Sequence, residues 1–289
     1  AYVDCSARRA CWQMRALLAG FVLFCALSVS LGATAPILSL SSDETVQGGF
    51  LYGKTKPGTK LTLDGRPVLV SADGRFFLAF HYNAGPAAML NATRPNGETE
   101  EYKIKVKARE FNVERIDGLP PAKVTAPPER QKRIAAESAK KRAARTQQGM
   151  QLDWTDGFIE PVKAYRVSGV YGSQRILNGV PKRPHYGIDM AAPAGTAVVA
   201  PAGGVVTLAE SDFWYEGGLI FLDHGHGLQS AFLHLSAVDV EVGAVVKKGD
   251  RLGAVGSTGR STGPHLDWRI NWGKVWIDPQ LLLAAQPLP

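Results

Sequence analysis

Two short stretches, His-Tyr-Gly-Ile-Asp at residues 185–189 and Thr-Gly-Pro-His-Leu-Asp-Trp at residues 262–268, bracket the part of the chain that decides the fold. Phe-Leu-His-Leu-Ser lies between them at residues 232–236. Together they supply three imidazoles and two carboxylates within a segment of short apolar runs and glycine turns. The chemistry of this chain is therefore expected between residues 185 and 267.

From Trp154 onward, short apolar runs alternate with glycine-containing turns such as Gly203-Gly204 and Gly217-Gly218. Runs of this length and spacing favour a compact antiparallel β-barrel or sandwich. No Gly-x-Gly-x-x-Gly or phosphate-binding loop stands at a strand-to-helix turn, which argues against nucleotide chemistry. The runs are Val198-Val199, Val205-Val206, 219–222, 231–233, Val245-Val246 and 252–255.

His185 and Asp189 stand four residues apart, a spacing that would place them on one face of a helix. Pro184 and Gly187 argue against a helix here, so we expect a turning loop to bring the two side chains together. A neutral imidazole and an ionised carboxylate are ligands of divalent metals. The pair is therefore a candidate part of a metal site.

His265 and Asp267 are two residues apart in a strand-like run, so their side chains should share one face of the strand. His234 is expected in the same alternation along its own run. Each residue alone could be an ordinary surface or hydrogen-bonding group. Five such groups in glycine- and proline-rich contexts favour a shared site. His224 and His226, at a glycine turn, are interpreted as structural.

These residues are where the chain resembles the LytM/lysostaphin-type zinc metallopeptidases, exported enzymes that cut peptide cross-bridges of peptidoglycan. The resemblance covers roughly residues 160–280 and consists of several motifs in the same order. It implies a fold of the duplicated hybrid motif type. The motifs are His-x-Gly-x-Asp at 185–189, Ala-Pro-Ala-Gly-Thr at 192–196, Ala-Pro-Ala-Gly-Gly at 200–204, His-Leu-Ser at 234–236, Lys-Lys-Gly-Asp-Arg-Leu-Gly at 247–253 and Gly-Ser-Thr-Gly-Arg-Ser-Thr-Gly-Pro-His-Leu at 256–266.

The resemblance implies a role for each matching residue. His185 and Asp189 would be metal ligands, with one zinc per chain, and Asp267 stands where the family has its third ligand, a histidine. His234 and His265 match the two catalytic imidazoles, which would orient or deprotonate a metal-bound water and stabilise the oxyanion. A further implied role concerns Arg175, which matches a position near the groove and would bind a substrate carboxylate.

Asp267 is the departure from the family pattern. Aspartate can ligate zinc, so the site is not lost. Two carboxylates around a divalent ion leave a formally neutral cluster, which should acidify water less and slow turnover. An oxygen-richer site would also admit a harder divalent metal such as manganese.

Ahead of this region, residues 36–115 read as a small β-sandwich with turn-prone Asp64-Gly65, Asp73-Gly74 and Asn96-Gly97. It contains no catalytic constellation, so a binding or spacer role is expected. Residues 116–153 read as a proline-rich boundary followed by a basic, alanine-rich helix. That helix would be a solvated linker or, as the alternative, a contact for an anionic polymer or lipid headgroups.

Residues 1–35 are interpreted as upstream sequence and an export signal. An apolar run at 16–31 follows several arginines, a start at Met14 fits it, and Ala33–Ala35 would be the cleavage region. The alternative is an uncleaved membrane anchor. The net charge is +7, and removal of residues 1–35, with three Arg and one Asp, would leave +5. A basic exported protein should be drawn to anionic envelope surfaces. No nucleic-acid motif is present.

All three cysteines, Cys5, Cys11 and Cys25, fall within residues 1–35, which excludes a thiolate nucleophile or a Cys-ligated zinc in residues 36–289.

The sequence thus predicts a mainly β protein with a LytM-like domain over residues 154–289. The predicted function is an exported, periplasmic zinc metalloendopeptidase acting on peptidoglycan peptides. The alternative is a silent LytM-like module that binds peptidoglycan or activates another hydrolase. Silent relatives usually lose several site residues, and one position is changed here, to a competent ligand. A glycosidase would need a carboxylate pair that metal binding explains better.

Overall fold

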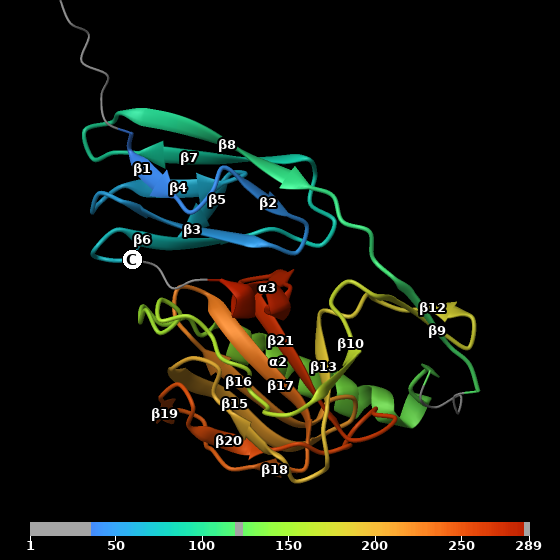
Figure 1. The fold of residues 1–289 in the computed structure, drawn as a ribbon. Helices are drawn as coiled ribbons and strands as arrows, with labels where there is room; N and C mark the ends of the chain where they lie inside the picture. The colour runs from blue at the N-terminus through green and yellow to red at the C-terminus, as the bar shows by residue number, and fades with distance from the viewer. Residues whose placement is uncertain (1–35, 119–123, 286–289) are drawn as a thin grey trace, which may run out of the picture. The chain divides into compact units, whose positions relative to one another are not determined.

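The computed structural model describes residues 36–118 and 124–285 (Figure 1). Strands dominate the described residues, so the predicted mainly β class is confirmed. Residues 36–289 form one compact unit. The predicted export signal and its cysteines lie outside the described residues. Among the helices that are described, none combines the length and the apolar character needed to cross a bilayer.

The N-terminal part is a sandwich of two sheets, as the sequence predicts. Their inward side chains, among them Phe76, Leu90 and Ile104, are fully buried in a common core. Asp64 and Gly65 both have positive φ and form the tight turn between β4 (Lys60–Leu63) and β5 (Arg66–Val68), as expected for Asp-Gly. One sheet has the order β1 (Leu38–Leu40), β3 (Phe50–Thr55), β6 (Arg75–Ala79); the other is β2 (Glu44–Val46), β8 (Thr99–Lys107), β7 (Ala87–Thr93), β4 (Lys60–Leu63), β5 (Arg66–Val68).

The C-terminal part is built on an eight-stranded sheet. The sheet ends at β10 on one side and β19 on the other, so it is open rather than a closed barrel. The order is β10 (Arg166–Gly169), β13 (Gly187–Ala191), β21 (His265–Trp272), β17 (Leu228–Leu235), β16 (Gly217–Asp223), β15 (Gly204–Phe213), β19 (Val245–Val246), with β22 (Val275–Ile277) paired to β21; β14 (Ala197–Val199), β20 (Arg251–Ala254) and β18 (Ala237–Val238) form a smaller sheet, and α3 (Pro279–Ala284) follows.

One face of the large sheet packs on the main core. Ile188, Trp268 and Phe232 alternate toward this core from β13, β21 and β17 and are fully buried. Phe77 of the N-terminal sandwich belongs to the same cluster and stacks edge-on against Trp154, with ring centroids 5.5 Å apart. The sandwich therefore shares apolar packing with the C-terminal part.

Strand β9 (Val113–Ile116) crosses residue 115, where the sequence predicts the end of the N-terminal domain. It pairs in parallel with β11 (Gln174–Leu177), which also pairs with β12 (Val180–Pro181). The segment that leaves the N-terminal sandwich is thus part of a C-terminal sheet. Pairing with a strand 61 residues away in sequence is a tertiary contact that the local pattern at 113–116 does not encode.

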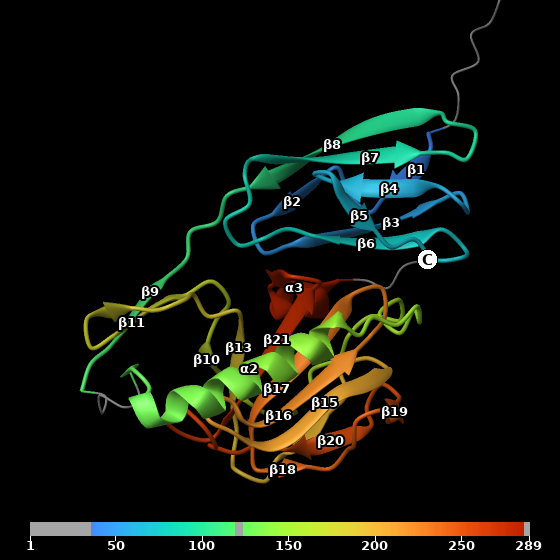
Figure 2. The ribbon, with the colours of Figure 1, turned by 180° about the vertical axis from the view of Figure 1, so that it is seen from behind.

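Helix α2 (Gln131–Thr146), preceded by the 3₁₀ turn η1 (Pro128–Arg130), occupies the predicted basic segment. It lies beside β15, as Figure 2 shows from behind. Ala144 is buried with Phe221, Ala231 and Leu233 on the face of the large sheet opposite the main core. The helix thus rests on the sheet through one narrow side, where Glu137 and Ala144 are buried, while its other alanines stay exposed. Most of its surface is solvated, as expected, and the contact with the sheet is what the sequence did not predict.

Ionic contacts hold the polar side of α2 to the sheet. Lys140 and Lys141 pair with Glu210 and Glu216 at 2.7 and 2.5 Å. Arg133 bonds to buried Glu137, whose carboxylate also accepts from the backbone N–H of Trp214 at 3.0 Å. Part of the charge predicted to meet an anionic surface is thus neutralised within the protein.

His224 is a buried structural residue, in agreement with its interpretation from the sequence. Its Nδ1 lies 2.6 Å from the Gly203 carbonyl oxygen and its Nε2 lies 2.7 Å from Ser230 Oγ. Burial lowers the pKa of His224 from 6.5 to about 4. The folded protein therefore keeps this imidazole neutral at a pH where the unfolded chain protonates it.

This difference predicts a pH-dependent stability. Above pH 6.5 both states are neutral at His224, whereas between pH 6.5 and 4 only the unfolded chain binds the proton, so stability falls as pH falls. The loss should reach about 3 kcal/mol at pH 4. We expect His224→Gln to reduce the slope of unfolding free energy against pH, measured by urea denaturation at several pH values. An unchanged slope in the variant would contradict this assignment.

Candidate metal centre

Strands β13 and β21 run antiparallel side by side, and two carboxylates meet on them. The register places Asp189 directly opposite Asp267. Neighbouring Ile188 and Trp268 point into the main core, so both carboxylates lie on the other face of the sheet. His265 shares that face with Asp267, as the two-residue spacing predicts. Asp189 itself is within a strand, where the sequence suggests a turning loop.

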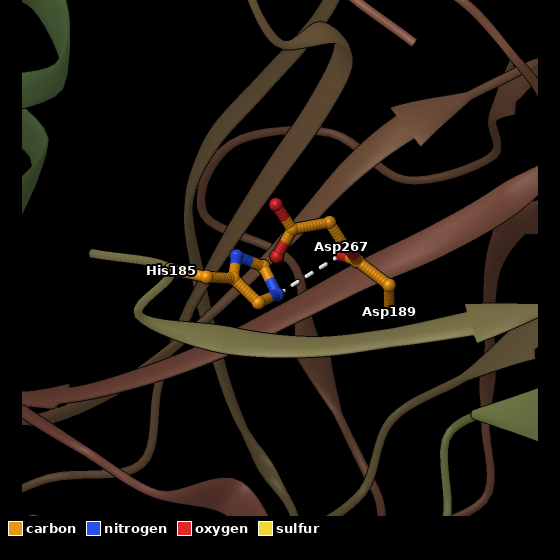
Figure 3. A group of neighbouring side chains, drawn as sticks. All are labelled: His185, Asp189 and Asp267. Carbon is orange, nitrogen blue, oxygen red and sulfur yellow. Dashed lines mark ion pairs between the residues drawn. The ribbon is translucent and has the colours of Figure 1, made fainter. Parts of the chain in front are cut away.

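His185 precedes β13 and completes the group shown in Figure 3. Its backbone N–H donates to the Ser173 carbonyl at 2.9 Å, and its carbonyl accepts from Gly172 N–H at 2.7 Å, which fixes the loop. Its Nε2 lies 3.1 Å from Asp189 Oδ1. Ligand atoms of His185, Asp189 and Asp267 all lie within 4.8 Å of one another. The structure thus brings together the three predicted metal-site residues.

Unsatisfied atoms in this group show that it fits a divalent cation. Nδ1 of His185 is buried without a hydrogen-bond partner. His185 Nε2 and Asp189 Oδ1 are also buried, and although they lie 3.1 Å apart they do not meet the geometry of a hydrogen bond to each other or to another described group. Leaving buried polar atoms unpaired costs about 1–3 kcal/mol each, so such atoms mark a missing partner. One imidazole nitrogen and two carboxylates form a donor set that suits zinc. The residues present therefore fit the metal that the sequence implies.

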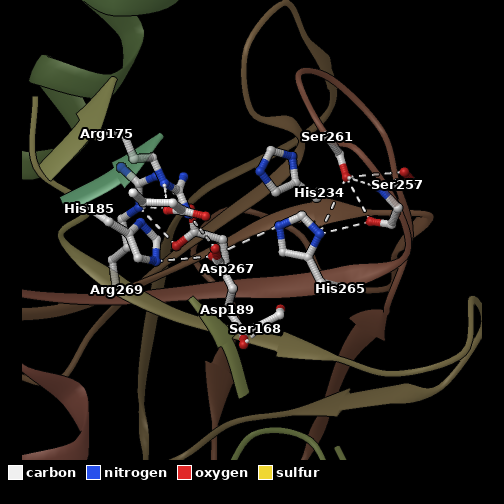
Figure 4. A network of polar contacts seen from close by, with 12 residues as sticks. Ser168, Arg175, His185, Asp189, His234, Ser257, Ser261, His265, Asp267 and Arg269 are labelled. Atoms are coloured by element: carbon white, nitrogen blue, oxygen red, sulfur yellow. Dashed lines mark hydrogen bonds and ion pairs between the residues drawn. The ribbon is translucent and has the colours of Figure 1, made fainter. Parts of the chain in front are cut away.

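Each carboxylate is bonded to an arginine (Figure 4). Arg175 Nη2 lies 2.6 Å from Asp189 Oδ2. Arg269 Nε donates to Asp267 Oδ1 at 2.9 Å, and its Nη2 donates to Oδ2 at 2.5 Å. Burial alone would raise the pKa of Asp267, but the adjacent Arg269 guanidinium outweighs it and the pKa lies below its usual range. Both carboxylates are therefore ionised.

These arginines correct the expected charge of the site. Counting only the carboxylates, a bound divalent ion would give a neutral cluster. Arg269 offsets Asp267, while Arg175 is shared between Asp189 and Glu114, so these five groups sum to −1 and would be +1 together with a divalent ion. The expectation of slow turnover assumed a neutral cluster of one divalent ion and two carboxylates. The two arginines, which lie outside the ligand motifs, remove that assumption.

Two glycines make room for these ion pairs. A Cβ on Gly169 would lie 2.3 Å from Asp189 Oδ2. One on Gly187 would lie 2.5 Å from the Trp268 carbonyl oxygen, 2.6 Å from Arg269 Cγ and 2.8 Å from Asp267 Oδ1. Real Cβ contacts are essentially never this short. Any larger residue at either position would displace a carboxylate or its arginine.

His234 and His265 lie side by side, with ring centroids 4.9 Å apart. Nδ1 of His234 lies 2.9 Å from the Thr258 carbonyl, and Nδ1 of His265 lies 2.8 Å from the Gly263 carbonyl. Because a carbonyl only accepts, each Nδ1 carries the hydrogen and each Nε2 is left as an acceptor. Burial lowers the pKa of His234, which keeps it neutral.

His234 does not follow the alternation predicted after Phe232. Its φ of 66° is left-handed, and the register between β16 and β17 shifts between Gly218 and Ile220. This local irregularity turns the imidazole out of the strand pattern to the wall of the same cavity as His265. The position of His234 therefore depends on a backbone feature that alternation cannot predict.

The site opens into a cavity of about 600 Å³. His185, Asp189, His234 and His265 line it, while Asp267 is buried behind them. Arg175 lies in the wall, where its Nε also bonds to Glu114 at 3.0 Å. The predicted substrate role of Arg175 stays a prediction. Its bonds to Glu114 and Asp189 use Nε and Nη2 of the five-donor guanidinium.

Two residues of this site were missed by the sequence reasoning. Arg269 stands two residues after Asp267 in the same strand, so the alternation that joins His265 to Asp267 could have found it. Glu114 gave no comparable signal, because it reaches the site through the parallel pairing of β9 with β11. The contact between Glu114 and Arg175 is a tertiary one that the local sequence does not predict.

Comparison with known proteins agrees with this geometry. The model of peptidase family M23 matches residues 183–279. A Pseudomonas aeruginosa protein of solved structure, assigned to peptidase M23, is 30% identical, and the match covers 82% of this chain and 94% of that protein with a TM-score of 0.63. The chain belongs to peptidase family M23.

Two curated relatives carry more specific names. DD-carboxypeptidase/endopeptidase Mpg of Neisseria meningitidis is 41% identical over 142 residues, which are 49% of this chain and 32% of that protein. Peptidoglycan DD-endopeptidase ShyA of Vibrio cholerae is 39% identical over 108 residues, which are 37% of this chain and 25% of that protein. The match thus spans a third or less of the length of these two relatives.

The glycine contacts predict that Gly187→Ala weakens metal binding. The new methyl group would meet the Trp268 carbonyl, Arg269 and Asp267, so β13 would have to move away from β21 and carry Asp189 away from Asp267. We expect zinc affinity to fall at least about tenfold, the lower end of effects seen for outer-shell changes. Chelator competition measures it. Gly85→Ala is the control, because no atom lies within 4 Å of its added Cβ. Equal zinc affinity in both variants would contradict the steric argument.

Proposed function

We propose that the chain is an exported zinc metalloendopeptidase that hydrolyses peptide cross-links of peptidoglycan. The observation that carries the proposal is the convergence of His185, Asp189 and Asp267, whose ligand atoms lie within 4.8 Å of one another, at a cavity that also presents two imidazoles. Membership of peptidase family M23 and the names of the two relatives support the same reaction class.

His185, Asp189 and Asp267 would hold the metal. Zinc held by these three residues would supply Lewis-acid chemistry, namely polarisation of a scissile carbonyl and a lowered pKa of water. His234 and His265 each offer an Nε2 acceptor, so either can take a proton from the attacking water. Once protonated, the same nitrogen donates a hydrogen bond and can stabilise the developing oxyanion. Their Nδ1 contacts with carbonyls keep both rings oriented for this role.

The cavity is suited to a peptide that bears carboxylates. Lys182, Arg183 and Arg260 line it, and none forms an ion pair with a carboxylate among residues 36–118 and 124–285. Arg260 lies over the Tyr215 ring at 4.5 Å, which holds its guanidinium at the wall. The peptides of peptidoglycan carry free carboxylates, so these cations supply complementary charge.

Export follows from the signal-like residues 16–35 and forms part of the proposal. A periplasmic location agrees with a peptidoglycan substrate, and an uncleaved signal would leave the protein anchored at the membrane. Exposed basic residues of α2 that form no ion pair in the described chain, such as Lys132 and Arg142, remain candidates for contact with an anionic envelope surface.

The first test measures zinc content together with release of cleaved muropeptides. We expect about one zinc per chain and metal-dependent cleavage in the parent protein. His185→Ala and Asp267→Ala should lose both, with activity falling more than the roughly 100-fold typical of outer-shell changes. Asp239→Ala serves as the control, because that carboxylate pairs with exposed Arg251 outside the cavity. Full activity in Asp267→Ala would contradict its role as a ligand.

A second test addresses the substrate charge. Arg260→Gln removes one cavity cation, and a hydrogen bond to a charged group contributes about 1.5–3 kcal/mol, so KM for a carboxylate-bearing peptide should rise about tenfold or more. We expect kcat to change much less. Arg251→Gln is the matched control outside the cavity. An unchanged KM in Arg260→Gln would show that this cation does not bind the substrate.

One observation favours the alternative, a silent module that binds peptidoglycan or activates another hydrolase. Both carboxylates already have arginine partners, which compete with a metal for their oxygens. The zinc measurement separates the two functions. A metal-free protein that binds peptidoglycan and stays inert after zinc addition would support the silent module over the enzyme.

A further inference from the structure

We propose that Asp267 and Arg269 act as one electrically neutral unit that faces the metal, so that Arg269 sets the metal affinity of this site through its charge. The inference rests on the proposed zinc site. It assigns to Arg269 a positioning and charge-balancing role that none of the ligand motifs contains.

The contact between the two side chains is close and double. Arg269 uses Nε and Nη2 against both oxygens of Asp267, a side-by-side geometry that fixes the carboxylate plane. The Asp267 side chain is 2% exposed and that of Arg269 is 27% exposed, so water does not separate them. A carboxylate has about four lone-pair sites, so the bonds to Arg269 leave acceptor capacity for an ion.

The surroundings of Arg269 make Asp267 its main counterion. Within the described residues, Asp267 is the carboxylate that forms an ion pair with it, while Asp189 and Glu216 act on it at longer range. Gly187 leaves the space that its side chain occupies. Removing one partner of a buried pair leaves an uncompensated charge at high cost. Substitution of either Asp267 or Arg269 is therefore expected to change the charge that the other presents to the metal.

A charge beside a divalent ion acts strongly in this partly desolvated setting. Unit charges 4 Å apart interact by about 4 kcal/mol at an effective dielectric constant of 20. If Asp267 were a neutral ligand, the unpaired Arg269 would repel the ion. If Arg269 were neutral, Asp267 would attract the ion with its full charge. Single changes at the two positions should therefore shift zinc affinity in opposite directions.

The test compares zinc affinity, by chelator competition, in the parent protein, Asp267→His, Arg269→Gln and the double variant. We expect Asp267→His to bind zinc at least about tenfold more weakly, because Arg269 loses its counterion, and Arg269→Gln to bind at least about tenfold more tightly. The double variant combines a neutral ligand with a neutral neighbour and should return to within about threefold of the parent. Circular dichroism checks the fold of each protein.

Other outcomes overturn the inference. Weaker zinc binding in Arg269→Gln, by the 10- to 100-fold typical of a lost orienting contact, would show a purely structural role. Failure of Arg269→Gln to restore zinc binding to Asp267→His would have the same meaning. Where the Gln variant does not fold, Arg269→Lys keeps the charge but loses the bidentate contact, so zinc binding should stay equal to the parent or weaken. Zinc binding about tenfold tighter than in the parent would overturn the charge argument.

The parent protein separates this inference from the proposed function. No zinc binding by the parent overturns both, because the proposed site would then hold no metal. Zinc binding with cleavage, but without the opposite shifts, leaves the peptidase proposal standing and removes the neutral unit. Activity is not needed for this decision, since the affinity measurement alone distinguishes the cases.

Discussion

The structure of the site depends on two carboxylates that face each other on adjacent strands. Asp189 and Asp267 are register partners on β13 and β21, and like charges placed directly opposite destabilise a sheet. Burial makes the repulsion worse, because the surrounding protein screens it poorly. The fold tolerates the pair because Arg175 and Arg269 each supply a cation at hydrogen-bonding distance, and because Gly169 and Gly187 leave the space for those contacts. A divalent ion between His185 and the carboxylates would relieve the remaining repulsion.

The walls of the site come from distant parts of the chain. Glu114 enters through the pairing of β9 with β11 and bonds to Arg175, which in turn bonds to Asp189. Helix α2 covers Ala231 and Leu233 on the same face of the large sheet, and Leu233 is the register partner of Asp267. Ile116 and Val124, from the segment that connects the N-terminal sandwich to α2, line the cavity itself. A boundary drawn from composition alone would cut through the groups that shape the cavity.

The mainly β class, the family and the convergence of His185, Asp189 and Asp267 could be predicted from the sequence, because short ordered motifs and two-residue alternation report local geometry. The open sheet, the packed position of α2 and the pairing of β9 could not, because each depends on contacts between segments far apart in sequence. His234 shows the limit within a single strand. Its left-handed φ interrupts the alternation, and that interruption is what brings its ring beside His265.

Asp267 shows why a ligand list does not determine the charge of a metal site. Replacing an imidazole by a carboxylate changes the charge by one only if the neighbouring residues stay the same. In this chain the residue two positions further along β21 is an arginine, and strand geometry places it on the same face. The Arg269 guanidinium therefore offsets the negative charge of Asp267, and it lies close enough to form two hydrogen bonds with that carboxylate. The electrostatics of such a site are therefore set by the face of the strand, of which the ligand motif is only one part.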